Sequence, residues 1–128
     1  EGMIGTQPGG DTAGAQKWKE LAAANGLDVD GPFQGEAYDA AALVILAMQA
    51  AGSSDRAAIA GNIQSVANAP GIKILPGEIS TALALLAAGI PVNYEGASTV
   101  ELDAAGDPPG AYLERVVKNG AWTTVATR

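Results

Sequence analysis

The sequence predicts an α/β chain, with four helices followed by short strands and a C-terminal hairpin. Residues 11–90 place apolar side chains at helical spacing between breaks rich in Gly, Pro, Asn and Ser. Residues 91–128 change to short extended runs. Asn119-Gly120, a dipeptide typical of a two-residue hairpin turn, separates the last two of these runs. A helical first part and an extended last part together indicate the α/β class.

The first expected elements are a strand and a helix. Residues 3–6 predict a short strand, which the Gly- and Pro-containing stretch 7–12 breaks. Asp11 or Thr12 can cap a helix over residues 13–24, because either side-chain oxygen can accept a hydrogen bond from a free N–H of the first turn. Asn25-Gly26 is expected to end this helix, since both residues tolerate the left-handed conformation.

The second helix is expected over residues 36–51, after a connector at 27–35 that contains Pro32. This helix is apolar on nearly all sides, so we expect it to be buried rather than half-exposed. Ser53 or Ser54 is then positioned to cap a third helix over residues 55–68.

The fourth helix is expected over residues 77–88. Pro76 near its start and Glu78 in its first turn both favour a helix beginning here, and Gly89 ends it. The remaining extended segments are expected at residues 72–75, 92–94, 99–102, 112–117 and 122–126.

The composition excludes several classes of function. The chain has 14 Asp and Glu against 7 Lys and Arg, a net charge of −7. A nucleic-acid binder or a protein of anionic membranes would need a basic surface, so neither partner is expected. The chain contains no Cys and no His, which removes thiol nucleophiles, Ser-His-Asp triads and ordinary zinc sites. We therefore expect no enzyme, no catalytic residue, no metal and no cofactor.

Tyr38 and Asp39 lie near the start of the apolar second helix and allow two interpretations. A ring with a hydroxyl group would suit a small amphipathic solute. The alternative is structural, with Tyr38 packing where the helix begins while Glu36 and Asp39 favour its positive end. The residues alone favour the structural interpretation.

Two acidic patterns have weak functional interpretations. Residues 103–107 resemble a calcium loop only faintly, because they lack the required oxygen ligands, so a plain turn is expected. Glu95 and Glu101 could form a carboxylate pair for acid–base chemistry. Nothing else in the chain suggests a sugar cleft, and we expect both to be surface charges.

Six short blocks carry a resemblance to a known family. They are Glu36-Ala37-Tyr38-Asp39-Ala40-Ala41, Pro76-Gly77-Glu78, Tyr94-Glu95-Gly96-Ala97-Ser98, Glu101-Leu102-Asp103, Gly106-Asp107 and Asn119-Gly120-Ala121-Trp122. In this order and at this spacing they resemble the C-terminal third of periplasmic substrate-binding proteins of the branched-chain amino-acid type. Those proteins are the two-lobed receptors that feed ABC importers. The resemblance covers nearly the whole chain and implies a fragment of a longer protein.

The implied fold is a partial type I periplasmic-binding-protein fold, one incomplete domain overall. Residues 1–8 would form a strand of the second lobe and a crossing between the lobes. Residues 9–107 would supply the helical part of the first lobe. Residues 108–128 would form another crossing and the C-terminal hairpin.

The implied function is capture of an amino acid or a related small carboxylate by hinge closure, as the solute-binding component of an ABC importer. The resemblance also suggests candidates for two roles. They are Phe33, Gln34 and Tyr38 for ligand binding, and Gln7, Pro8, Pro108 and Pro109 for the hinge.

The implied partners are the small solute, the membrane permease of the importer, and either the remaining N-terminal part of the parent protein or a second copy of the chain. The implied location is periplasmic or extracellular, where a missing N-terminus could carry a lipid anchor. Two other classes stay open: a stand-alone structural or oligomerisation domain without ligand, and an enzyme that uses carboxylates alone.

Overall fold

The computed structural model describes residues 1–29 and 33–128, which form four helices and five strands. In chain order they are β1 (Ile4–Pro8), α1 (Ala13–Ala24), α2 (Gln34–Ala51), α3 (Arg56–Ala67), β2 (Ile72–Ile74), α4 (Ile79–Ala87), β3 (Val92–Tyr94), β4 (Tyr112–Lys118) and β5 (Ala121–Thr127). The expected connector at 27–35 includes residues 30–32, Pro32 among them, and this part of the prediction lies outside the described residues.

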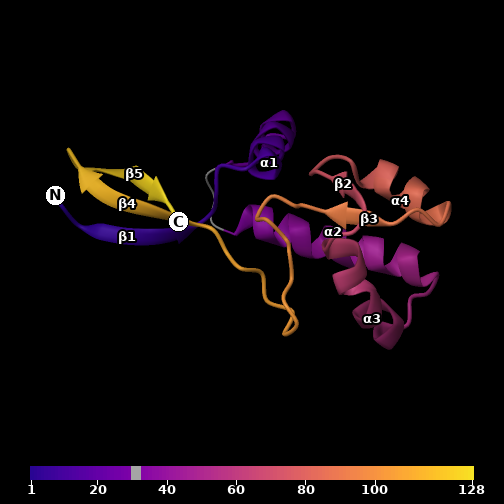
Figure 1. Ribbon diagram of the computed structural model, residues 1–128. Coiled ribbons are helices and arrows are strands. Elements are labelled where there is room, and N and C mark those ends of the chain that lie inside the picture. The colour runs from indigo at the N-terminus through magenta and orange to yellow at the C-terminus, as the bar shows by residue number, and fades with distance from the viewer. Residues whose placement is uncertain (30–32) are drawn as a thin grey trace.

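The first and last strands of the chain form one antiparallel sheet, in the order β1-β4-β5. β4 lies in the middle, with Ile4 opposite Val116 on one side and Trp122 opposite Val117 on the other. In Figure 1 this sheet stands at one end of the molecule, away from the helices. The two ends of the sequence therefore build one part of the molecule, and the helices with β2 and β3 build the other.

The hairpin between β4 and β5 confirms the turn predicted from Asn119-Gly120. Lys118 pairs with Ala121 across the turn. Asn119 has φ 53° and Gly120 has φ 76°. Two successive positive φ angles are the requirement of a type I′ turn, and Asn and Gly meet it at the lowest steric cost.

The second part of the molecule is a helical body around α2. α3 and α4 pack on α2, and the short parallel pair β2–β3 completes the layer (Figure 1). Residues from all these elements and from the loop after β3 share one apolar core. Its buried members are Ala42, Leu43, Leu46, Ala47, Val66, Ala67, Ile74, Ala82, Val92, Tyr94 and Val100.

The predicted boundaries of α1 are confirmed. The hydroxyl of Thr12 accepts a hydrogen bond from the Ala15 N–H at 3.1 Å, so Thr12 rather than Asp11 is the cap. Asn25 ends the helix, and Gly26 follows it in the left-handed conformation with φ 69°.

Two other predicted helix starts differ in detail. The cap of α3 is Asp55, whose carboxylate accepts from the N–H groups of Ala57 and Ala58. The prediction of Ser53 or Ser54 as this cap is wrong, and Ser53 instead accepts from the Asp55 N–H. Glu78 lies just before α4 instead of in its first turn, and its carboxylate accepts from the Leu75 N–H.

Residues 99–102, expected to be a strand or an extended segment, form no strand. Thr99 has φ 64°, a left-handed conformation that a β-branched residue rarely adopts and that ends an extended run. Leu102 bonds the side chain of Asn68 in place of a neighbouring strand, donating at 2.8 Å and accepting at 2.7 Å. This amide satisfies the backbone groups that a strand would have paired.

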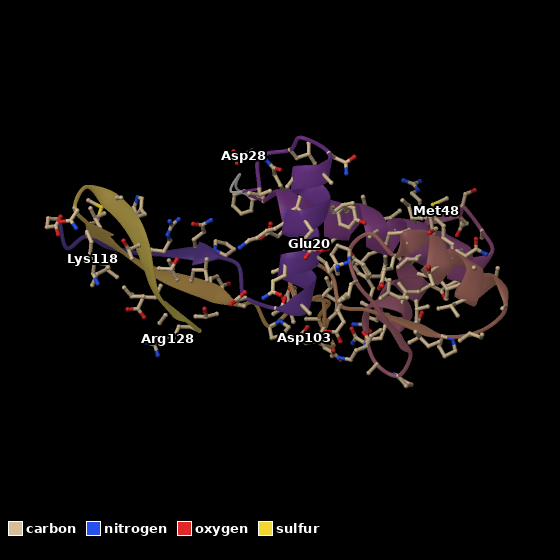
Figure 2. All side chains as sticks on the ribbon, turned by 90° about the horizontal axis from the view of Figure 1, so that it is seen from above. Glu20, Asp28, Met48, Asp103, Lys118 and Arg128 are labelled. Atoms are coloured by element: carbon tan, nitrogen blue, oxygen red, sulfur yellow. The ribbon has the colours of Figure 1, made fainter. Side chains whose placement is uncertain are left out.

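The prediction that α2 is buried on all sides is correct for one face only. Asp39 and the four α2 members of the core are buried, whereas Val44, Ile45 and Met48 are 44%, 45% and 37% exposed. Figure 2 shows Met48 on the side of the helical body away from the three-stranded sheet. An apolar face of α2 is therefore in contact with solvent.

Candidate functional site

A cavity lies where the three-stranded sheet meets the helical body. Its volume is about 290 Å³. Five segments contribute to it: the end of β1 with the residues after it, α1 and the stretch following it, the start of α2, the loop after β3, and β4. The lining residues are Thr6, Gln7, Pro8, Gly9, Gly10, Ala15, Trp18, Lys19, Val29, Phe33, Gly35, Glu36, Ala97, Ser98 and Leu113.

The walls of this cavity combine apolar and polar side chains. The large apolar side chains among the lining residues are those of Trp18, Val29, Phe33 and Leu113. The polar groups include an amide, two hydroxyls, a cation and a carboxylate, from Gln7, Thr6, Ser98, Lys19 and Glu36. Small-solute sites usually show this combination, in which apolar area supplies affinity and a few polar groups fix the orientation.

Glycines allow the helices to meet the loop after β3 at short distance. A Cβ atom on Gly14, in the first turn of α1, would lie 1.8 Å from the Gly96 carbonyl oxygen. A Cβ atom on Gly35, in the first turn of α2, would lie 3.1 Å from the Ala97 Cβ. α1 therefore meets Gly96 almost backbone to backbone, and α2 meets the methyl group of Ala97. Gly35 and Ala97 both line the cavity.

Asp39 binds the same loop from the other side. Its side chain is 2% exposed. One carboxylate oxygen accepts hydrogen bonds from the Tyr94 hydroxyl at 2.7 Å and the Ala97 N–H at 2.8 Å. The other accepts from the Ser98 N–H at 2.8 Å and the Ser98 hydroxyl at 2.6 Å. Four donors around a buried carboxylate replace the water that it loses on burial.

The Asp39 carboxylate also affects Tyr94. Burial raises the pKa of the Tyr94 hydroxyl well above its usual range, and the negative charge and hydrogen bond of Asp39 raise it further. Tyr94 therefore stays protonated and remains a donor to Asp39 throughout the physiological range.

Tyr38 packs against a wall residue of the cavity, Trp18. Its ring lies 5.1 Å from the ring of Trp18, tilted by 37°. Its hydroxyl oxygen accepts a hydrogen bond from the Gly77 N–H at 3.0 Å. Tyr38 is not among the lining residues, but it packs on Trp18, which is part of the wall.

The other candidates from the sequence divide between the cavity and its surroundings. Phe33, Gln7 and Pro8 line the cavity, whereas Gln34, Pro108 and Pro109 do not. Phe33 is 67% exposed and has φ 60°, a left-handed conformation that is costly for an aromatic residue. Phe33 therefore lines the cavity with most of its surface exposed to solvent.

Sequence reasoning missed several wall residues. No binding role is predicted from the sequence for Trp18, Lys19, Ser98 or Leu113. Leu113 reaches the cavity because β4 pairs with β1, which places it opposite Gln7 from the other end of the chain. No local pattern in the sequence indicates such a pairing.

The acidic patterns have structural roles. Asp103 accepts from the N–H groups of Ala105 and Asp107, which closes the predicted turn and lowers the pKa of the Asp103 carboxyl. Glu95 forms an ion pair with Lys73 at 2.6 Å. Within residues 1–29 and 33–128, no group of three or more acidic side chains could hold a metal ion.

No helix in the described part of the chain is both long and apolar enough to span a membrane.

Comparison of the structure with solved proteins defines the class of fold. The leucine-binding protein LivK from Thermotoga maritima superposes with a TM-score of 0.64 at 23% sequence identity. The superposition covers 99% of this chain and 31% of that one. The chain therefore has part of the type I periplasmic-binding-protein fold, as its sequence predicted.

A curated relative lies nearer in sequence. The chemotactic signal transduction system substrate-binding protein BasB from Halobacterium salinarum is 42% identical over 83 residues, which are 64% of this chain and 20% of that protein. No family model matches the chain. The resemblance to substrate-binding proteins is confirmed, and the chain spans about a fifth of the length of the curated relative and about a third of the solved one.

Proposed function

We propose that the chain is part of a solute-binding protein and that its cavity is one portion of the cleft between two lobes. The observation that carries this proposal is the place of the cavity. It lies at the junction of the three-stranded sheet and the helical body, and residues from both parts line it. A cleft between two bodies is a common place for a small solute to bind.

The walls suggest a small zwitterion with an apolar portion, such as an amino acid. Lys19 and Glu36 offer one charge of each sign. Trp18 and Phe33 offer aromatic surface for an aliphatic side chain. The similar solved protein is named for leucine, so L-leucine is the first solute to test.

Closure of the cleft would require the two parts to move relative to each other. Two stretches outside the helices and strands connect them, residues 9–12 and residues 95–111. The first adjoins Gln7 and Pro8, and the second contains Pro108 and Pro109. We propose that these four residues form a hinge, because segments that end elements commonly absorb the change of backbone angles in domain closure.

The two tryptophans of the chain provide a matched test of the cavity. Trp18 lines it, whereas Trp122 lies in β5, is 46% exposed and is not a lining residue. In the longer protein, Trp18→Ala should weaken L-leucine binding in calorimetry by about tenfold or more, given the wall area lost. Trp122→Ala should leave the affinity within about twofold. Equal effects of the two substitutions would refute the cavity as the site.

The partner that receives the solute has two candidates. The resemblance to importer receptors favours a membrane permease, with the protein outside the cytoplasmic membrane. The curated relative is named for chemotactic signal transduction, which favours a signalling receptor instead. Deleting the gene should abolish uptake of labelled solute in the first case and the swimming response to that solute in the second.

The alternative is a structural or oligomerisation domain that binds no solute. It predicts that none of the standard L-amino acids binds the longer protein. It also predicts that substitutions at Trp18 change only stability.

A further inference from the structure

The loop after β3 forms a wall of the cavity although it belongs to no strand or helix. Ala97 and Ser98 are its lining residues. Ala97 is packed against Trp18 and Ala22 in a small cluster of its own, apart from the main core. The position of this wall therefore depends on the groups that bind the loop.

Asp39 accepts three hydrogen bonds from Ala97 and Ser98. It uses both carboxylate oxygens, and each one accepts one of the two successive backbone N–H groups of Ala97 and Ser98. The backbone approaches closely because residue 96 is glycine: with φ 65°, a Cβ there would lie 2.8 Å from the second oxygen of Asp39. Asp39 belongs to α2, the helix whose first residues, Gly35 and Glu36, form the adjacent wall.

We propose that Asp39 is a positioning residue of the cleft, which fixes the Ala97–Ser98 wall against the start of α2 and thereby sets the shape of the site. This inference rests on the proposed function. Asp39 does not line the cavity and need not touch the solute. Its effect passes through Ala97 to Trp18 and through the Ser98 hydroxyl, which donates to Asp39 and so can offer only a lone pair to a solute.

Replacement of Asp39 by Asn tests the proposal with little change in volume. The hydroxyls of Tyr94 and Ser98 can rotate and accept from the new amide group, whereas a backbone N–H cannot. The amide nitrogen must face either the Ala97 N–H or the Ser98 N–H, whichever way the side chain is turned. One of the two wall residues therefore loses its acceptor in either orientation.

The chain offers a matched control in Asn68. Its side chain binds the same loop further along, donating to the Leu102 carbonyl and accepting from the Leu102 N–H. Asn68→Asp makes the opposite change, from an amide to a carboxylate. It also removes the hydrogen bond that the Asn68 amide donates to the loop. Neither Asn68 nor Leu102 lines the cavity.

The experiment measures L-leucine binding by calorimetry in the longer protein. Asp39→Asn should weaken binding by about tenfold or more, and Asn68→Asp should leave it within about twofold, although both variants lower the melting temperature. Unchanged affinity in Asp39→Asn would overturn the proposal. Equal weakening by the two variants would overturn it as well, because loss of loop stability would then explain both.

A second readout needs no solute. In the longer protein, with Trp122 and any tryptophan outside these 128 residues replaced by Phe, Trp18 is the single tryptophan. Asp39→Asn should then shift its emission and increase its quenching by acrylamide. Asn68→Asp should change neither. One outcome separates the two proposals: the protein without substitutions at positions 39 and 68 binds no L-leucine, while Asp39→Asn, but not Asn68→Asp, changes the emission of Trp18. In that case L-leucine is not the solute, and the positioning role of Asp39 stands.

Tyr94→Phe covers the case in which Asp39→Asn does not fold. It removes one of the four hydrogen bonds from a fully buried residue outside the cavity. It should weaken binding by about threefold and shift Trp18 emission in the same direction. A folded Tyr94→Phe protein with unchanged affinity and emission would overturn the proposal.

Discussion

At the scale of the residue, Tyr94 and Asp39 make a prediction about alkaline pH. Burial and the neighbouring Asp39 carboxylate raise the pKa of the Tyr94 hydroxyl. The unfolded state releases this proton near the ordinary value of 10.0, before the folded state does. The resulting stability is complete below that pH and is lost as the pH rises above it.

Ultraviolet titration of phenolate should therefore show Tyr94 ionising only as the fold is lost. Tyr94→Phe identifies its share of the absorbance. An intact circular dichroism spectrum beside a fully ionised Tyr94 would contradict the assignment.

Tyr38 carries the second prediction at this scale. Tyr38→Ala removes the ring behind Trp18 and should weaken solute binding by about tenfold in calorimetry, with the fold largely kept. Tyr38→Phe keeps the ring and loses only the bond from the Gly77 N–H, so its affinity should stay within about twofold. If Tyr38→Phe binds as weakly as Tyr38→Ala, the hydroxyl rather than the ring carries the role.

Residue roles could be predicted from the sequence where the contact is local. Thr12 caps α1 through a residue three positions away, and the short spacing alone indicates this bond. Asp39 was interpreted as a charge at the helix start, because its partners are 55 to 59 residues away. Contacts of that separation depend on the packing of whole elements and leave no periodic pattern.

At the scale of the element, two glycines predict opposite effects of one substitution. Gly14→Ala drives a methyl group into the Gly96 carbonyl and should lower the free energy of unfolding by about 1–3 kcal/mol. Gly61 lies within α3, where a Cβ would meet nothing within 4 Å. Gly61→Ala should raise the free energy by about 0.5–1 kcal/mol, since Ala favours the helix.

Chemical denaturation of the longer protein measures both values. Stabilisation by Gly14→Ala would show that α1 does not contact the loop after β3. The same variant should also weaken solute binding, because it separates two walls of the cavity.

Elements were predictable where the chain carries a local signal. The helices and the Asn119-Gly120 turn follow from periodicity and from turn chemistry. Residues 99–102 form no strand although they have residue types that favour one. The backbone groups of Leu102 are paired with the Asn68 side chain instead of with a neighbouring strand. The pairing of β1 with β4 joins residues more than a hundred positions apart, and no prediction from the sequence included it.

At the scale of the whole molecule, exposed apolar surface predicts association. Val44, Ile45 and Met48 lie on one face of α2 in contact with solvent. The 128-residue chain by itself should therefore self-associate in analytical ultracentrifugation. Ile45→Glu should reduce this association, because it places a charge on the apolar face. A monodisperse monomer that unfolds cooperatively would contradict the prediction.

The central claim is that the cavity is one portion of a cleft between two lobes, and calorimetry tests it most directly. L-leucine and the other standard L-amino acids are titrated into the longer protein and into the 128-residue chain under the same conditions. We predict that the longer protein binds one of them and that the chain alone binds the same solute far more weakly, because a cleft needs both walls. Equal affinity in the two samples, or no binding by the longer protein, would contradict the claim.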